Sequence, residues 1–105
     1  MAENLVRLDL GRFTATDVSK ILGLQSKLRL MHRWFRHERV TADGTDAITV
    51  YSGDRGPTPY ASYRFVRHRD GQYELVNART RASLARGRTV DTVLRALPDD
   101  FYYAR

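Results

Sequence analysis

The chain contains no cysteine. This absence excludes disulfide bonds, thiol catalysis and cysteine-ligated zinc, and it suits a reducing compartment. No apolar run approaches the roughly 20 residues that a membrane-spanning helix needs. The first residues, MAENLVRLDL, lack the basic start and the apolar core of a secretion signal. We therefore expect a cytoplasmic protein with no membrane partner.

Lysine is also scarce, since only Lys20 and Lys27 are lysines among the 18 basic residues, and the formal net charge is +6. GC-rich coding is one explanation, because it favours arginine over lysine. The other explanation is functional, because the planar guanidinium binds phosphate through two parallel hydrogen bonds and stacks on bases. In either case the positive balance favours an anionic partner, either a nucleic acid or an acidic protein.

The length of 105 residues, 42% of them apolar, predicts one α+β domain over residues 1–105 with a single modest core. β-branched and aromatic residues predict an antiparallel sheet of three or four strands, at about 47–52, 60–68, 72–78 and 82–86. Asp70-Gly71 is the hairpin signal between the second and third of these strands. A further short strand is predicted at residues 5–10.

Three helices are predicted, at about 15–22, 25–38 and 89–97. Thr14 or Thr16 can cap the first helix, and Thr89 can cap the last, which we expect to pack on one face of the sheet. On a common straight axis the apolar residues of the first two helices would point in opposite directions. We therefore expect a tight turn at Gly23-Leu24 between them, with a sharp kink as the alternative.

The most informative stretch is LQSKLRLMHRWFRHER, from Leu24 to Arg39. At about 100° per residue, a helix here separates an apolar arc from a basic arc. Cations on successive turns could follow a phosphate backbone or enter a major groove, since each neutralised phosphate releases counterions. The predicted nucleic-acid-binding residues are therefore Arg29, Arg33, Arg36 and Arg39, with Lys27 and His32 at the periphery.

Other interpretations of the basic arc stay open. The arc could be merely solvated, or paired with acids from elsewhere such as Asp43, Asp46 or Glu74. Together with the tyrosine-rich strands and the aromatic tail, it could instead make the chain a protein-interaction module or an inhibitor that docks on an acidic protein, because arginine and tyrosine are favoured at interfaces. The partner could also be a second copy of the chain.

Two segments resemble known nucleic-acid-binding families. FTATDVSKILGL, residues 13–24, resembles the opening of helix-turn-helix DNA-binding segments of the MerR and excisionase type, which implies DNA binding. The order helix, strands, helix, with a Gly-Pro loop after the first strand, is similar to a double-stranded-RNA-binding domain. GRTVDT stands where that family has a lysine cluster at the start of its last helix.

No motif in the chain predicts catalysis. His68-Arg69-Asp70 spells the kinase catalytic-loop triplet, but neither a glycine-rich loop nor a DFG motif accompanies it. His32 and His37 are five residues apart, so on a helix they would not converge on a metal. We therefore predict that the protein is not an enzyme and that it needs neither a cofactor nor a metal.

Overall fold

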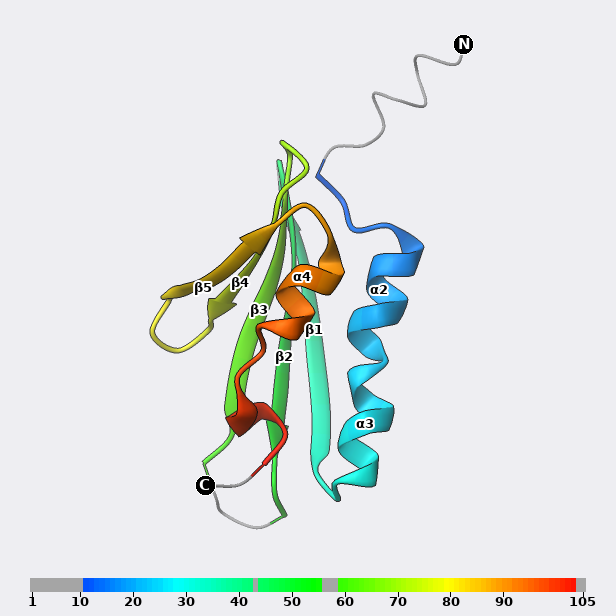
Figure 1. The fold of residues 1–105 in the computed structure, drawn as a ribbon, viewed down its shortest axis with the longest axis vertical. Helices are drawn as coiled ribbons and strands as arrows, with labels where there is room; N and C mark the ends of the chain where they lie inside the picture. Colours follow the sequence, from blue (N-terminus) through cyan, green and yellow to red (C-terminus); the bar gives the residue numbers. More distant parts are fainter. Residues whose placement is uncertain (1–10, 43, 56–58, 104–105) are drawn as a thin grey trace.

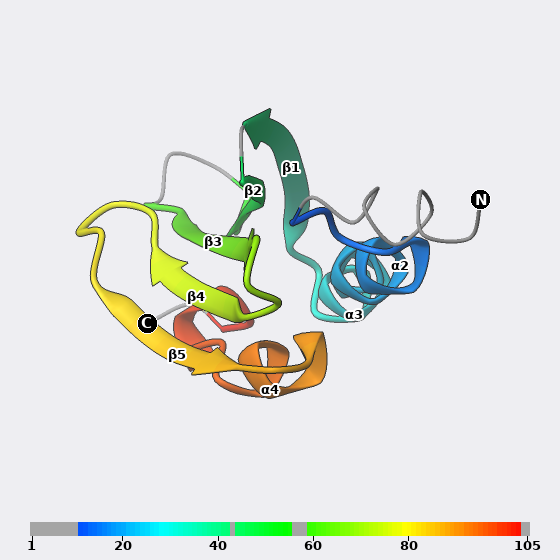
Figure 2. The ribbon, with the colours of Figure 1, turned by 90° about the horizontal axis from the view of Figure 1, so that it is seen from above.

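The computed structural model describes residues 11–42, 44–55 and 59–103, so the predicted strand at 5–10 lies outside the described residues. An antiparallel sheet in the order β1-β2-β3-β4-β5 forms the body of the molecule, with strands Trp34–Ala42, Thr45–Gly53, Ala61–His68, Tyr73–Asn77 and Ser83–Gly87. The helices lie on the inner side of the curved sheet (Figures 1 and 2): α2 (Ala15–Leu22), α3 (Leu24–Leu30), α4 (Val90–Arg95) and the 3-10 helix η1 (Asp99–Phe101).

The α+β class, the N-terminal helical pair, the antiparallel sheet and the C-terminal helix are confirmed. Thr14 caps α2 in a capping box with Asp17, and the side chain of Thr89 accepts a hydrogen bond from the N–H of Thr92 at the start of α4. The predicted count of three or four strands is wrong, because the sheet has five. The additional strand is β1, whose first residues, 34–38, were predicted to be helical.

The second predicted helix, at about 25–38, is therefore too long, since α3 ends at Leu30. His32 has φ 57°, in the left-handed region. Its N–H donates to the carbonyl of Arg29 at 3.1 Å, and the N–H of Arg33 donates to the carbonyl of Leu28 at 3.0 Å. These two bonds form a Schellman motif, which satisfies the last carbonyls of a helix and turns the chain out of it.

After this turn the chain runs back as β1, paired with β2 from Trp34 opposite Gly53 to Ala42 opposite Thr45. The pairing leaves only residues 43 and 44 to connect the strands, and Gly44 has φ 78°, a conformation that glycine adopts at little cost. The ladder supplies hydrogen-bond partners on the β2 side of β1, and a helix over the same residues would leave β2 as an unpaired edge. This pairing explains why the helical periodicity of the segment does not decide its structure.

The junction between α2 and α3 is a one-residue break at Gly23, which keeps right-handed helical angles of φ −61° and ψ −17°. The predicted tight turn with opposed apolar sides is therefore absent. Ile21, Leu24 and Leu28 are all buried and form one stripe across the break. Figure 1 accordingly shows α2 and α3 running end to end along the same side of the sheet.

Strand alternation divides the sheet into an inner and an outer face. The inner face carries the core, to which the sheet contributes Ile48, Val50, Tyr63, Phe65 and Leu75 and the helical elements contribute Ile21, Leu28, Val93 and Phe101. The aromatic tail packs on the domain through Phe101, which is fully buried, whereas Tyr103 stays 55% exposed. The outer face has no helix over it in Figure 2.

One carboxylate on the inner face is completely buried. Asp46 accepts hydrogen bonds from the N–H of Phe13 at 2.9 Å, from Nε of Arg39 at 3.0 Å and from the hydroxyl of Thr41 at 3.2 Å. Burial by itself raises the pKa of Asp46, but the hydrogen bonds and the charge of Arg39 outweigh it and lower the pKa below its usual value. The ionised form is therefore the one that holds the segment before α2 against the sheet.

We expect Asp46→Asn to lower the free energy of unfolding by about 1–3 kcal/mol at pH 7, the usual cost of losing hydrogen bonds to a buried charged group. A lowered pKa means that the contribution is complete above about pH 4, the unfolded value, and is lost as the pH falls through the folded pKa. Urea unfolding across a pH series should therefore show that the difference in free energy of unfolding between the wild type and Asp46→Asn decreases as the pH falls.

Asp91→Asn is the matched control, because Asp91 pairs with Lys20 at the surface, with side chains 51% and 44% exposed. Such a pair contributes less than about 1 kcal/mol. If Asp46→Asn and Asp91→Asn lower the free energy of unfolding equally at pH 7, the assigned role of Asp46 is wrong.

Candidate nucleic-acid interface

The six residues predicted to bind nucleic acid do not share one face, because the segment that carries them is half helix and half strand. The structure distributes them over four places. Arg29, His32 and Arg33 lie around a hollow where α3 turns into β1. Arg36 lies on the outer face of the sheet, Arg39 on the inner face, and Lys27 in a separate groove between α3 and the C-terminal segment.

Two of these arginines are paired with carboxylates. Arg39 binds Asp46, an acid that the sequence already suggested as a partner. Arg33 is only 8% exposed and its Nη1 lies 2.8 Å from Oδ1 of Asp54. Nη2 of Arg33 also donates to the carbonyl of Asp100 at 3.2 Å and lies 3.4 Å from Oγ of Ser52. Arg33 therefore acts as a structural residue that joins the start of β1 to β2 and η1.

Trp34, Tyr51 and Tyr60 form a group of rings on the outer face, which we call the aromatic platform. The ring centroids of Trp34 and Tyr60 are 6.3 Å apart, and those of Tyr51 and Tyr60 are 6.0 Å apart. Trp34 is 37% and Tyr60 49% exposed, so the rings are available to a ligand. A helix over Leu24–Arg39 would place Trp34 on its apolar arc, whereas the strand turns Trp34 outward.

Arginines lie against the aromatic platform. The guanidinium carbon of Arg36 is 6.0 Å from the centroid of Trp34 and 5.5 Å from that of Tyr51, and Arg79 lies 5.9 Å from the centroid of Tyr60. These are cation–π distances. The platform therefore combines flat ring faces with positive charge, which is the combination that binds bases and phosphates together.

The backbone holds Trp34 in a fixed position. Its Nε1 donates to the carbonyl of Asp54 at 3.0 Å. Its ring lies against Gly53, where an added Cβ would come within 2.6 Å of Cζ2 of Trp34. Only glycine at position 53 leaves room for the ring. The position of Trp34 is therefore set before any ligand arrives.

Tyr51 is fixed by a carboxylate instead. Its hydroxyl donates to Oε1 of Glu38 on the neighbouring strand β1. That hydrogen bond, together with burial, raises the pKa of Tyr51 above its usual value. The phenol therefore stays protonated, and the platform gains no negative charge from it.

The hollow beside the platform has a volume of about 310 Å³ and is lined by Gln25, Arg29, His32, Arg33, Trp34, Phe35 and Arg55. We call it the cationic hollow. Of its basic residues only Arg33 has a carboxylate partner among the described residues, while Arg29, His32 and Arg55 are exposed and have none. Trp34 belongs both to the cationic hollow and to the aromatic platform, so the two are continuous.

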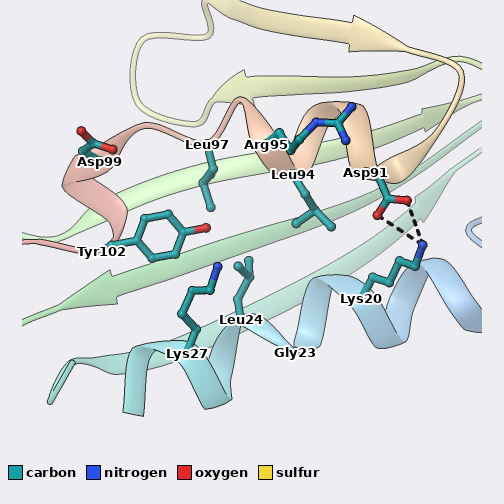
Figure 3. Close-up of a pocket in the computed structure, with 10 residues that line it drawn as sticks. All are labelled: Lys20, Gly23, Leu24, Lys27, Asp91, Leu94, Arg95, Leu97, Asp99 and Tyr102. Atoms are coloured by element: carbon teal, nitrogen blue, oxygen red, sulfur yellow. Dashed lines mark hydrogen bonds and ion pairs between the residues drawn. The ribbon is translucent and has the colours of Figure 1, made fainter. Parts of the chain in front are cut away.

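A larger groove of about 590 Å³ lies on the helical side, between α2–α3 and the C-terminal segment (Figure 3). Both lysines line it, with Lys20 paired to Asp91 at 2.9 Å and Nζ of Lys27 5.2 Å from the ring centroid of Tyr102. Arg95 adds a positive charge to the lining of the groove, and Asp99 adds a negative one. The mixed lining gives little preference for an anion, so this groove is the weaker candidate.

Sequence reasoning missed all three rings of the aromatic platform, Arg79 beside them, and Arg55 of the cationic hollow. A usable signal was present in Asp43-Gly44, the same hairpin dipeptide that correctly predicted the turn at Asp70-Gly71. A hairpin at residues 43 and 44 requires a strand before it. That strand would have placed Trp34 and Arg36 together on one face.

Comparisons with known protein families, with curated proteins and with solved structures find no match for this chain. Across the described residues, no helix has the length and apolar character needed to cross a membrane. The same part of the chain holds no group of three or more histidine or acidic side chains placed to bind a metal ion.

The different surroundings of Arg33 and Arg29 lead to a stability prediction. Arg33→Met should lower the free energy of unfolding by about 1–3 kcal/mol, because it leaves buried acceptors without a donor. Arg29→Met should change it by no more than about 0.5 kcal/mol, the usual range for an exposed site. Urea unfolding followed by circular dichroism measures both free energies. If the two substitutions lower them by similar amounts, Arg33 does not join the start of β1 to β2 and η1.

Proposed function

We propose that the protein binds single-stranded nucleic acid on the outer face of its sheet, with bases stacked on the aromatic platform and phosphates bound by the adjoining arginines. The observation that carries this proposal is the set of exposed rings with Arg36 lying against two of them. Stacking of a base on an aromatic side chain contributes about 1–3 kcal/mol and tolerates any base, because every base has a flat face.

A single strand fits this surface better than a duplex. Bases offer their flat faces to side chains only when they are unstacked. Reading a duplex through its major groove needs a projecting element such as a basic helix. The helix predicted for that role ends at Leu30, and Arg36 lies on a strand beyond it.

Charge on the same face supports phosphate binding. Arg64 lies on the outer face of β3, where its Nε donates to the hydroxyl of Thr49 at 3.0 Å, and no described carboxylate pairs with it. Each phosphate neutralised by such a side chain releases counterions, so the logarithm of the binding constant should fall with the logarithm of the salt concentration, by about 0.7 per phosphate for single strands.

Trp34 is the only tryptophan and belongs to the aromatic platform, so its fluorescence reports on this surface directly. We expect a short single-stranded oligonucleotide to quench that fluorescence with a salt-dependent affinity. Tyr60→Ala should weaken binding about 5- to 150-fold, which corresponds to the loss of one stacked base.

Tyr103→Ala is the matched control, because Tyr103 has a similar exposure of 55% and lies outside the aromatic platform. It should leave the affinity unchanged. If folded Tyr60→Ala binds as tightly as the wild type, or if low salt reveals no quenching, the proposal is wrong.

The second candidate function is docking on an acidic protein. It is favoured by two exposed apolar residues, Leu30 at 82% and Val40 at 66% exposure, and by the outer edge of β1, which pairs with no other strand among the described residues. An exposed strand edge presents backbone N–H and C=O groups with which a partner chain can pair. A stoichiometric protein partner that survives nuclease treatment and is lost on Val40→Asp would favour this candidate over nucleic acid.

A further inference from the structure

We infer that the cationic hollow binds the terminal phosphate monoester of a nucleic-acid strand, so that the protein recognises a phosphorylated strand end. This inference rests on the proposed function, because the rest of the strand would lie on the aromatic platform. The two sites meet at Trp34, which lines the cationic hollow and whose ring lies 6.3 Å from that of Tyr60. A nucleotide stacked beside Trp34 can therefore extend its terminal phosphate into the hollow.

The charges in the cationic hollow favour a monoester over an internal phosphate. A terminal phosphate carries a charge of about −1.5 to −2 at pH 7, against about −1 for a diester within the chain, and it offers an additional oxygen. Arg29 and Arg55 are exposed and have no described carboxylate partner, so their guanidinium groups are available for bidentate binding. The imidazole of His32 and the amide of Gln25 add further hydrogen-bond donors at the same rim.

Arg33 gives the cationic hollow a rigid wall. Its guanidinium is held by Asp54, Ser52 and the backbone of Asp100, so it does not turn toward a ligand. The Schellman motif holds the backbone at His32 in the left-handed conformation. The main chain at His32 and Arg33 is therefore preorganised, and ligand binding needs to order only the exposed side chains of Gln25, Arg29, His32 and Arg55.

The size of the cationic hollow suits one end of a strand. Its volume of about 310 Å³ lies at the lower limit of the range of about 300–1,000 Å³ that is typical of small-ligand sites. A phosphate with its sugar fits this space better than a run of nucleotides. The larger groove with the two lysines is less selective for an anion, because the carboxylates of Asp91 and Asp99 also line it.

The test compares short single-stranded oligonucleotides of one sequence that differ only at the end: 5′-phosphate, 3′-phosphate or hydroxyl at both ends. Binding is measured by quenching of Trp34 in the intact protein. We expect one phosphorylated form to bind about ten-fold tighter than the hydroxyl form. The double substitution Arg29→Met/Arg55→Met should abolish this preference while changing the affinity for the hydroxyl form much less.

Arg88→Met is the matched control, because it removes an exposed arginine before α4 that lines neither the cationic hollow nor the aromatic platform. It should preserve the preference. Equal affinity for all three oligonucleotides would overturn the inference and leave the proposed function standing. No binding of any oligonucleotide would overturn the proposed function and the inference with it.

Competition identifies the source of the phosphate. A nucleoside monophosphate and inorganic phosphate are each titrated against the bound phosphorylated oligonucleotide. We expect the nucleoside monophosphate to displace it at a lower concentration, because its base also stacks on Trp34. If inorganic phosphate competes equally well, the hollow holds a free anion and the assignment to strand ends is wrong.

Discussion

The buried guanidinium of Arg33 is the interaction on which the arrangement of this protein depends. A charge removed from water must find acceptors, or it costs several kcal/mol. Arg33 finds them on Ser52 and Asp54 at the end of β2 and on the backbone of Asp100 in η1. Three segments that are distant in sequence therefore meet at the point where α3 turns into β1. The position of Trp34, the next residue, follows from this constraint.

The arginines of this chain serve two purposes, and the presence or absence of a carboxylate partner separates them. Arg36 and Arg39 are three residues apart on β1 and consequently point to opposite faces of the sheet. Arg39 binds the buried carboxylate of Asp46 and helps to lower its pKa, whereas Arg36 lies on exposed rings. Residue type alone thus does not separate stabilising arginines from those available to a ligand. The formal charge of +6 counts both kinds of arginine alike, although only some of the positive groups face solvent without a carboxylate partner.

Much of the fold was predictable because its signals are local. Thr14 and Thr89 cap helices where the sequence places them, and Asp70-Gly71 turns between two strands that alternation identifies. The candidate site was less predictable. Arg29, His32 and Arg33 do lie together, although around the end of a helix and not along its face. Trp34 joins them because its segment is a strand and not a helix. Arg55 comes from the segment after β2, which no spacing within residues 24–39 could bring in.

The sequence by itself determined the helix caps, the hairpin turns, the alternating strands and the positive charge, because each depends on neighbouring residues along the chain. Only the tertiary structure decided the state of residues 31–42. The helical periodicity of residues 24–30 continues into that segment through Trp34 and Phe35, whereas the dipeptide Asp43-Gly44 after it is a hairpin signal. The residues of the segment itself therefore do not choose between a helix and a strand. The choice is made by backbone pairing with β2 and by acceptors for Arg33 as distant as Asp100. These partners come together only once the sheet has assembled. For that reason the residues predicted to form one basic helix face are instead divided, and several of them lie at the aromatic platform and the cationic hollow.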